Sequence, residues 1–406
     1  MEIPIAIDEE SADSSTIGSD VSRWILTEAR GFPTPAGFVN ALCRLLVERG
    51  IPLWRVTIYA GTLHPQLLGY GWRWWRDRRV TEEVRVAQGT ELSTQYVESP
   101  LRKTIEQGLR LRRRLDGDLD GCPLLAQLRD QGGTDYMVAP LNQVRSRYAA
   151  VTWATDRSGG FTERDLAILE AIRPALAATI ETRVLRRTAR TLFSIYHSRE
   201  VGERIFDGHI LRGHVERLHA AILVTDLRGF TAISDQRPAE AVIEALDDYF
   251  EYVAESVHAA HGLILKFVGD GVLAIFPADA DKEARAAANA LAAAREMLRR
   301  IEDRKSGKDD GSAVTLRAGV ALHLGEVMYG NVGSPDRLDF TAVGPAVNLS
   351  FRLEGLTKEL RQSIVTSRAF AQACPGKLRS LGHHEIRGLS EPEEVFGLTE
   401  HAGKIP

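Results

Sequence analysis

The spacing of apolar residues in the first part of the chain predicts a mixed α+β domain. A helical spacing of apolar positions extends from Ala36 to Glu48. Short apolar runs from Trp54 to Ile58 and from Tyr148 to Ala154 are typical of strands, and glycine-rich segments separate them. We therefore expect several short strands and at least one amphipathic helix before residue 182.

A long helix is predicted after Thr162. Thr162 is a suitable N-cap because Asp165 follows three residues later. One apolar stripe then recurs every three or four residues, at Leu169, Ile172, Leu176, Ile180 and Val184. Pro174 should kink this helix. Because the pattern persists through Leu192, residues 183–217 are interpreted as a helical connector that dimerises, or as a helix packed on its own domain.

The pattern changes after His219 and predicts a ferredoxin-like domain. An apolar run at residues 220–226 ends in an acid, and a helical stretch follows from Ala241 to Val257. Two apolar runs within residues 263–276 meet at a Gly-Asp-Gly turn, which favours a β-hairpin. A helix at 284–300, a strand at 314–324 and a helix at 347–358 complete the pattern. The β-α-β-β-α-β order suits one sheet with helices on one face.

Composition divides the chain into parts and narrows the functional classes. All six tryptophans lie within the first 153 residues, which indicates two separately built cores. The resulting interpretation is a disordered acidic tail at residues 1–21, a first domain at 22–182, the connector at 183–217 and a second domain at 218–400. Lysine and arginine number 51 against 55 acidic residues, so no global basic field is available to hold nucleic acid.

Other sequence features favour a cytoplasmic protein without a membrane span. The three cysteines are far apart and form no CxxC pair, so neither a disulfide framework nor a zinc site is indicated. The N-terminus lacks the basic start and apolar run of a signal peptide, and no run of about 18 apolar residues occurs. The segment GYGWRWWRDRR, residues 69–79, mixes aromatic and basic residues as some nucleic-acid platforms do, but Trp72 and Trp74 are expected to face a core.

Two aspartates in the second part are candidates for a metal site. Asp226 ends the first predicted strand, and Asp270 lies at the tip of the hairpin. If that strand lies beside the hairpin, both carboxylates meet at one edge of the sheet. With no His or Cys nearby, they suit Mg²⁺ or Mn²⁺, and two such ions can support an in-line displacement at phosphorus. The backbone from Leu227 through Gly229 and Phe230 to Thr231 enters a helix, where a triphosphate can be held.

Three segments resemble the signature segments of the class III nucleotidyl cyclases, in the usual order. They are TDLRGFTAIS, KFVGDGVLAIF and DFTAVGPAVNLSFRLEGL, within a match that covers about residues 218–399. The resemblance implies a ferredoxin-like core that dimerises head to tail, with active sites between protomers. It also implies that Asp226 and Asp270 bind two Mg²⁺ or Mn²⁺ ions, that Lys266 and Thr341 contact the base, and that Asn348 and Arg352 orient the ribose and stabilise the transition state.

The residue at the base position favours ATP as the substrate. Adenine N1 accepts a hydrogen bond whereas guanine N1 carries a hydrogen, and the ammonium of Lys266 can only donate. Guanylyl cyclases of this family typically have an acid at this position. Thr341 stands where many adenylyl cyclases have Asp, and the Thr form resembles a largely bacterial branch. Its hydroxyl can accept from the adenine amine but can also donate.

Lys266 and Asp270 are four residues apart on one hairpin, so a site shared between two protomers is expected. One subunit would supply the aspartates and the other would supply Lys266, Thr341, Asn348 and Arg352. Pro345 stands where many relatives have an acid, and we expect only a structural variation in the first turn of the helix.

Alternative interpretations remain for both parts. The segment FTERDLAILEAIRPALAATI is similar to the helix that often ends GAF domains, which implies a GAF-like sensor for an unknown small molecule or protein. The second part is alternatively a guanylate or dual-specificity cyclase, or a pseudo-cyclase that binds nucleotide and signals by shape. A scaffold whose first domain binds a partner is a third possibility. A diguanylate cyclase is disfavoured because the GGDEF-type turn is missing.

Overall fold

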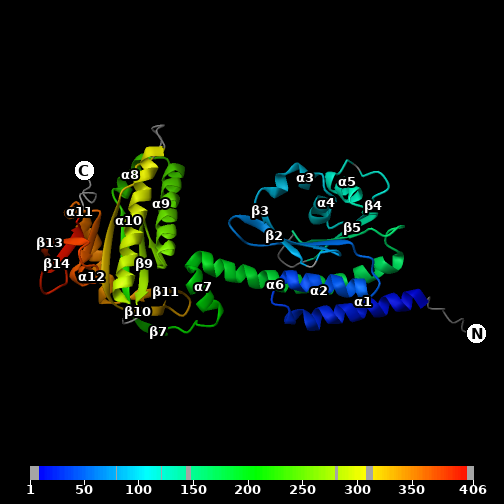
Figure 1. The fold of residues 1–406 in the computed structure, drawn as a ribbon, viewed down its shortest axis with the longest axis horizontal. Helices are drawn as coiled ribbons and strands as arrows, with labels where there is room; N and C mark the ends of the chain where they lie inside the picture. Colours follow the sequence, from blue (N-terminus) through cyan, green and yellow to red (C-terminus); the bar gives the residue numbers. More distant parts are fainter. Residues whose placement is uncertain are drawn as a thin grey trace, which may run out of the picture. The chain divides into compact units, whose positions relative to one another are not determined.

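A computed structural model describes residues 9–78, 80–119, 121–142, 148–278, 282–307 and 314–399 of the chain. Backbone contacts divide it into two compact units, Met1–Leu192 and Phe193–Pro406. Each unit contains one sheet with helices on both faces (Figure 1). The prediction of an α+β chain with two cores is therefore confirmed, and the boundary between the units lies at residues 192 and 193, inside the predicted connector.

The first unit is built on a six-stranded antiparallel sheet. Its strand order is β3-β2-β1-β6-β5-β4. The strands are β1 (Arg55–Gly61), β2 (Leu67–Trp75), β3 (Glu82–Ala87), β4 (Leu111–Arg114), β5 (Asp135–Pro140) and β6 (Ala150–Thr155). The predicted strands at residues 54–58 and 148–154 correspond to β1 and β6.

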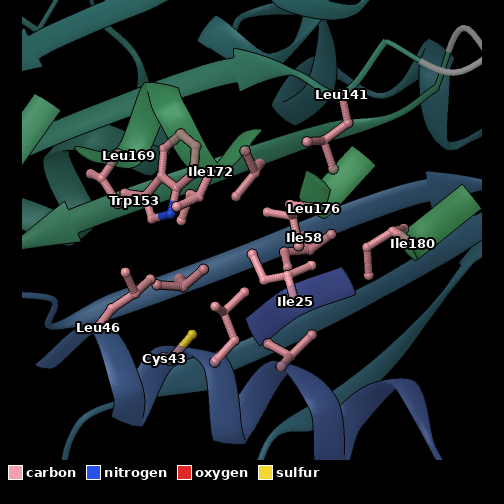
Figure 2. Close-up of a cluster of buried hydrophobic side chains, with 14 of the residues drawn as sticks. Ile25, Cys43, Leu46, Ile58, Leu141, Trp153, Leu169, Ile172, Leu176 and Ile180 are labelled. Carbon is pink, nitrogen blue, oxygen red and sulfur yellow. The ribbon is translucent and has the colours of Figure 1, made fainter. Parts of the chain in front are cut away.

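Helices cover both faces of this sheet (Figure 1). One face packs against α1 (Glu9–Glu28), α2 (Pro35–Glu48) and α6 (Glu163–His197), with η1 (Ala29–Gly31) between the first two. The other face carries η2 (Thr90–Leu92), α3 (Thr94–Val97), α4 (Pro100–Gln107) and α5 (Pro123–Asp130). Figure 2 shows Cys43 and Leu46 of α2 and Ile172 of α6 within the same core. Trp72 and Trp74 are also buried there, as predicted.

The predicted N-terminal tail is wrong for residues 9–21, because these residues belong to α1. Val21 and Ile25 are fully buried in the core of the first unit. Gly18 allows a close helix–helix approach, because a Cβ at this position would lie 2.7 Å from Cβ of Ala171 in α6. Residues 1–8 of the predicted tail lie outside the described residues.

The predicted long helix is α6, and its predicted N-terminal cap is present. The backbone N–H of Asp165 donates to Oγ1 of Thr162 at 3.2 Å, and the N–H of Thr162 donates to Oδ2 of Asp165 at 2.8 Å. The helix continues past Pro174 to His197, and α7 (Arg199–Phe206) follows. The connector is not helical throughout. α7 ends at Phe206, Gly208 has φ 95°, and β7 already begins at Val215.

The second unit contains the predicted ferredoxin-like core within a larger sheet. The strand order is β13-β14-β12-β10-β7-β9-β8, and β11 pairs with β10. The strands are β7 (Val215–Leu227), β8 (Leu263–Val268), β9 (Gly271–Ala278), β10 (Ala318–Gly333), β11 (Leu338–Val343), β12 (Ile364–Ser367), β13 (Leu378–His384) and β14 (Glu393–Leu398). The first four of these are antiparallel neighbours in the order β10-β7-β9-β8, which is the ferredoxin-like arrangement.

The two faces of this sheet are covered differently. α9 (Ala239–Ala259) and α10 (Glu283–Gly307) pack on one face, as predicted, together with α12 (Arg368–Ala373). α11 (Pro345–Glu359) packs on the opposite face, where β11 and α7 also lie. The prediction of helices on one face therefore holds for α9 and α10 but not for α11. α8 (Phe230–Gln236) follows β7.

None of the helices within the described ranges is both long enough and apolar enough to pass through a bilayer.

Candidate active site

Asp226 and Asp270 meet at one edge of the sheet of the second unit. β7 and β9 are neighbours, and Thr225 pairs with Val272. Asp226 follows this pair on β7, and Asp270 lies in the turn just before β9. Gly271 brings the turn against the first carboxylate, because a Cβ at Gly271 would lie 3.0 Å from Oδ1 of Asp226. The predicted convergence of the two aspartates is therefore observed.

The surroundings of Asp226 disfavour its charged form. Burial raises the pKa of this carboxyl above its ordinary value, and the nearby Asp270 raises it further. Glu354 of α11 lies close to both, and its pKa is also raised, first by burial and then by Asp226. Three acidic side chains thus repel one another in a partly buried position.

A hard divalent cation fits this arrangement. Carboxylate oxygens are the ligands that Mg²⁺ and Mn²⁺ prefer, and a cation would remove the repulsion that raises the pKa of Asp226. No group of three or more His, Cys, Asp or Glu side chains within the described ranges forms a ready-made metal cage. The aspartate pair therefore fits an ion that takes its other ligands from water or from a bound phosphate.

Gly319 makes the close packing of Glu354 against this edge possible. On β10 it pairs with Asp226 of β7, on the face that α11 covers. A Cβ at Gly319 would lie 2.3 Å from Oγ1 of Thr357 and 2.8 Å from Oε1 of Glu354. A larger residue at this position would push α11 away from the aspartate pair.

The segment after Asp226 turns sharply into α8. Gly229 has φ 71° and precedes the helix, so this glycine has a conformational role in the turn. Leu227 is buried and Phe230 packs against the core, whereas Thr231 is exposed. The side chain of Leu227 therefore serves packing, and that of Phe230 is partly buried against the same core.

Lys266 contacts Asp339 on β11, the strand that also carries Thr341. A bulge between Ile264 and Lys266 shifts the register of β8 against β9. Nζ of Lys266 donates a hydrogen bond to Oδ2 of Asp339 on β11 at 2.5 Å. Asp339 and Thr341 are two residues apart on β11, so they share a face of that strand. Thr341 itself is largely buried.

Asn348 and Arg352 lie on the exposed side of α11, one turn apart. Pro345 is the first residue of this helix, as predicted for a variation in the first turn. The guanidinium of Arg352 lies against Gly388, where a Cβ would be 3.0 Å from Nη1. Within the described part of the chain, no hydrogen bond or ion pair joins Asn348 or Arg352 to the aspartate pair.

The family of this segment follows from its match to a known domain. Residues 216–396 match the adenylate and guanylate cyclase catalytic domain family. This segment is a class III cyclase catalytic domain. The resemblance carried by the three signature segments is therefore confirmed for the second unit. The GAF-like character of the first unit stays a prediction.

Relatives of the cyclase domain include proteins named as adenylate cyclases. The chain is 32% identical over 213 residues to adenylate cyclase 1 of Rhizobium meliloti, covering 52% of this chain and 32% of that protein. It is 30% identical over 157 residues to an adenylate cyclase of Anabaena cylindrica, covering 38% of this chain and 31% of that protein. The chain thus spans about a third of the length of these two relatives.

A solved structure of a bacterial light-regulated adenylyl cyclase has a similar fold. Its TM-score is 0.50 at 23% sequence identity, and the match covers 57% of this chain and 66% of that one. This similarity supports the α+β fold of the chain.

Two acidic residues of the cyclase domain were missed by the sequence analysis. Asp339 could have been predicted from the sequence, because it precedes Thr341 by two residues on the same strand. Glu354 could not have been predicted, because nothing local distinguishes it from a solvated helix residue. Its position beside Asp226 depends on how α11 packs across β10 at Gly319.

Proposed function

We propose that the chain is an adenylate cyclase that converts ATP into 3′,5′-cyclic AMP and pyrophosphate. The observation that carries this proposal is the pair of partly buried carboxylates, Asp226 and Asp270, at one sheet edge of a cyclase catalytic domain. In the reaction, the ribose 3′-oxygen forms a bond to the α-phosphorus. The bond from that phosphorus to the oxygen bridging the α- and β-phosphates breaks, and the proton of the 3′-hydroxyl is released.

The aspartate pair would hold two Mg²⁺ or Mn²⁺ ions. When bound, these ions supply activation of the 3′-hydroxyl and neutralisation of charge on the phosphate oxygens. Asp226 and Asp270 would provide the carboxylate ligands. The backbone from Leu227 to Thr231 directly follows Asp226 in the chain and would receive the triphosphate.

Asn348 and Arg352 would act on the ribose and the reacting phosphate. Both side chains are exposed on one face of α11, where they can reach a ligand. A planar guanidinium can grip two phosphate oxygens as charge shifts in the transition state, whereas the Asn348 amide can orient the ribose.

The preference for ATP is proposed to come from Lys266 and Thr341. The ammonium of Lys266 donates to adenine N1 but would meet a hydrogen on guanine N1. Nζ of Lys266 donates to Asp339, two residues before Thr341 on β11, so Asp339 would hold the ammonium on the strand that carries the second proposed base contact. A guanylate or dual-specificity cyclase remains the alternative, because the Thr341 hydroxyl can donate as well as accept.

We further propose that the active site is shared by two chains of a homodimer. Lys266 and Asp270 are separated by only four residues on one hairpin, and they belong to different groups of side chains. Asn348 and Arg352 are exposed to solvent. Among the described residues of a single chain, neither forms a hydrogen bond or ion pair with the two aspartates. A second protomer would bring the missing half to each site.

The first unit is proposed to be a GAF-like sensor that regulates the cyclase through α6 and the segment up to Val215. The length of α6, 35 residues, motivates this role. Deletion of residues 1–200 should alter basal or regulated activity. Unchanged activity in the deleted protein would remove the regulatory role but leave the cyclase proposal intact.

The deciding experiment measures cyclic nucleotide formation from ATP and from GTP, with Mg²⁺ or Mn²⁺. The wild type is compared with Asp270→Asn, Lys266→Glu and the control Asp247→Asn, which changes an exposed aspartate of α9. We expect cyclic AMP from the wild type and the control, none from Asp270→Asn, and a weakened preference for ATP in Lys266→Glu. Nucleotide binding without product in every condition would instead support the pseudo-cyclase alternative.

A further inference from the structure

A cavity of about 610 Å³ lies within the first unit, in the part that the cyclase chemistry does not use. Its floor is the face of the sheet opposite α1, α2 and α6, and residues of η2, α3, α4 and α5 form the other walls. Figure 1 shows these short helices on that side of the sheet. The volume is within the range of roughly 300–1,000 Å³ that small-molecule sites occupy.

Small side chains in the middle of the sheet create the space. One row of paired residues crosses four strands, with Trp75 beside Arg55, Arg55 beside Ala154, and Ala154 beside Tyr136. Because Ala154 has only a methyl group, a gap separates the long side chains of Arg55 and Tyr136. Thr57 and Thr152 form the pair two residues further along β1 and β6, on the same face of the sheet, and they also line the cavity.

Several residues that line this cavity carry a buried polar atom without a hydrogen-bond partner. Nε of Arg55, Nε of Arg73 and the hydroxyl of Tyr136 are buried and have no hydrogen-bond partner among the described residues. At the opposite wall, the hydroxyl of Tyr96 and Oε2 of Glu91 are also buried and have no hydrogen-bond partner among the described residues. Buried polar groups are nearly always hydrogen-bonded in folded proteins. Five such atoms belong to residues around this one cavity, so its lining carries polar groups that no described residue pairs.

The charge near the floor of the cavity is positive. The guanidinium carbons of Arg55, Arg73 and Arg78 lie 5.5, 5.6 and 3.7 Å from the ring centroid of Trp75. Burial lowers the pKa of Arg55, and the neighbouring Arg73 lowers it further. Glu82 is 3.6 Å from Nη1 of Arg73 and half exposed, so it balances only part of this charge.

We propose that this cavity is a binding site for a small organic molecule that carries a carboxylate or phosphate group. The oxyanion lies between Arg55 and Arg73 and receives a hydrogen bond from the hydroxyl of Tyr136. Arginine forks match the geometry of both oxyanions. Glu91 and Tyr96 at the far wall accept and donate to a polar group at the other end of the ligand.

The test uses the full chain, with benzoate and phenyl phosphate as probes and benzamide as the neutral control of similar size. Tryptophan fluorescence reports only on the first unit, because all six tryptophans lie there, and Trp75 lines the cavity. We expect at least one oxyanion to bind at least about tenfold more tightly than benzamide. Arg55→Gln and Arg73→Gln should each weaken that binding by about tenfold or more, and Tyr136→Phe should weaken it less.

Arg85→Gln is the matched control for the arginine variants. Arg85 is exposed on β3, between Val84 and Val86, which line the cavity, so its side chain leaves the opposite face of the strand. Binding should be unchanged in this variant. Arg55→Lys keeps the positive charge and serves if Arg55→Gln lowers the melting temperature too far.

Three results would overturn the proposal. They are equal binding of benzamide and the oxyanions, wild-type binding in the folded Arg55 and Arg73 variants, and no binding of any probe at millimolar concentration. Each of these results would mean that Arg55 and Arg73 do not hold an oxyanion in this cavity. None depends on cyclase activity, so the outcome is independent of the function proposed for the second unit.

Discussion

Lys266 and Asp339 form an ion pair between β8 and β11, with Nζ of Lys266 donating to Oδ2 of Asp339 at 2.5 Å. The two side chains retain 42% and 50% of their exposure, so this pair adds little to the stability of the domain. What it does is fix the position of the Lys266 ammonium beside the strand that carries Thr341. We infer that Asp339 is a positioning residue for the proposed base-binding group.

Replacement of Asp339 by asparagine should therefore affect nucleotide binding more than the chemical step. We expect KM for ATP to rise several-fold while kcat changes by less than about threefold, because the amide holds the ammonium less firmly. The preference for ATP over GTP should fall as well. Steady-state kinetics with both nucleotides measure these effects, and Asp336→Asn, an exposed residue just before β11, is the control. A loss confined to kcat would contradict a positioning role.

Asp226→Asn should stabilise the protein in the absence of divalent ions while abolishing cyclase activity. The pKa of Asp226 is raised in the fold by burial and by Asp270, so ionisation of this group costs folding free energy. The penalty is absent below the ordinary pKa of an aspartate and grows as pH rises through the raised pKa. The melting temperature of Asp226→Asn should therefore exceed that of the wild type at pH 8, with a smaller difference at pH 4.

Divalent ions should reverse this order. Mg²⁺ or Mn²⁺ should raise the melting temperature of the wild type, because ions that bind only the folded state stabilise it, and should have a smaller effect on Asp226→Asn. Asp247→Asn should follow the wild type in both conditions. An excess of EDTA should abolish product formation. Equal melting temperatures of wild type and Asp226→Asn at pH 8 without metal would mean that burial of this carboxylate and its repulsion by Asp270 cost the fold little.

Elements with strong local signals were predicted from the sequence, whereas α1 was not. The segment from Ser11 to Asp20 is acidic and rich in serine, and its composition favours solvation over a helix. The structure buries Val21 and Ile25 of α1 in the core and places Gly18 against Ala171, about 150 residues later. A contact at that sequence separation leaves no local trace, so tertiary packing overrides composition here.

The same distinction applies to the candidate site. Asp226 and Asp270 were predicted to converge because each ends a strong strand or hairpin signal, and neighbouring strands of a ferredoxin-like sheet bring those ends together. Glu354 depends on the packing of α11 over Gly319, and that packing is determined by long-range contacts. A helix on this face was not expected, since the sequence pattern specifies an amphipathic helix but not the face of the sheet that it covers.

The cap of α6 should make a measurable contribution to the stability of the first unit. Thr162→Ala removes the hydroxyl that accepts from the N–H of Asp165, and the expected loss is about 1 kcal/mol of unfolding free energy. Denaturant unfolding followed by tryptophan fluorescence measures this loss for the first unit alone. Thr182→Ala is the matched control within the same helix, because Oγ1 of Thr182 donates only to the carbonyl of Ala178. An equal effect of both substitutions would argue against a specific capping contribution.

Complementation between two inactive variants should test the shared active site directly. Asp270→Asn removes one proposed metal ligand, whereas Arg352→Ala removes the guanidinium proposed to act from the other subunit. Each variant alone should form no cyclic AMP. If the two groups come from different protomers, a mixed dimer contains one site with both defects and one intact site. Random pairing at equal amounts then restores about a quarter of the wild-type activity.

The control pairs Asp226→Asn with Asp270→Asn, since both of these residues are proposed to belong to the same half of each site. In that mixed dimer every site lacks one aspartate, so no activity should return. The subunits must be exchanged before the assay, by dilution below the dimer dissociation constant or by co-expression with different tags. Failure of the Asp270 and Arg352 variants to complement, in dimers shown to be mixed, would mean that one chain supplies the whole site. The exposed side of α11 would then have to reach the aspartates of its own protomer.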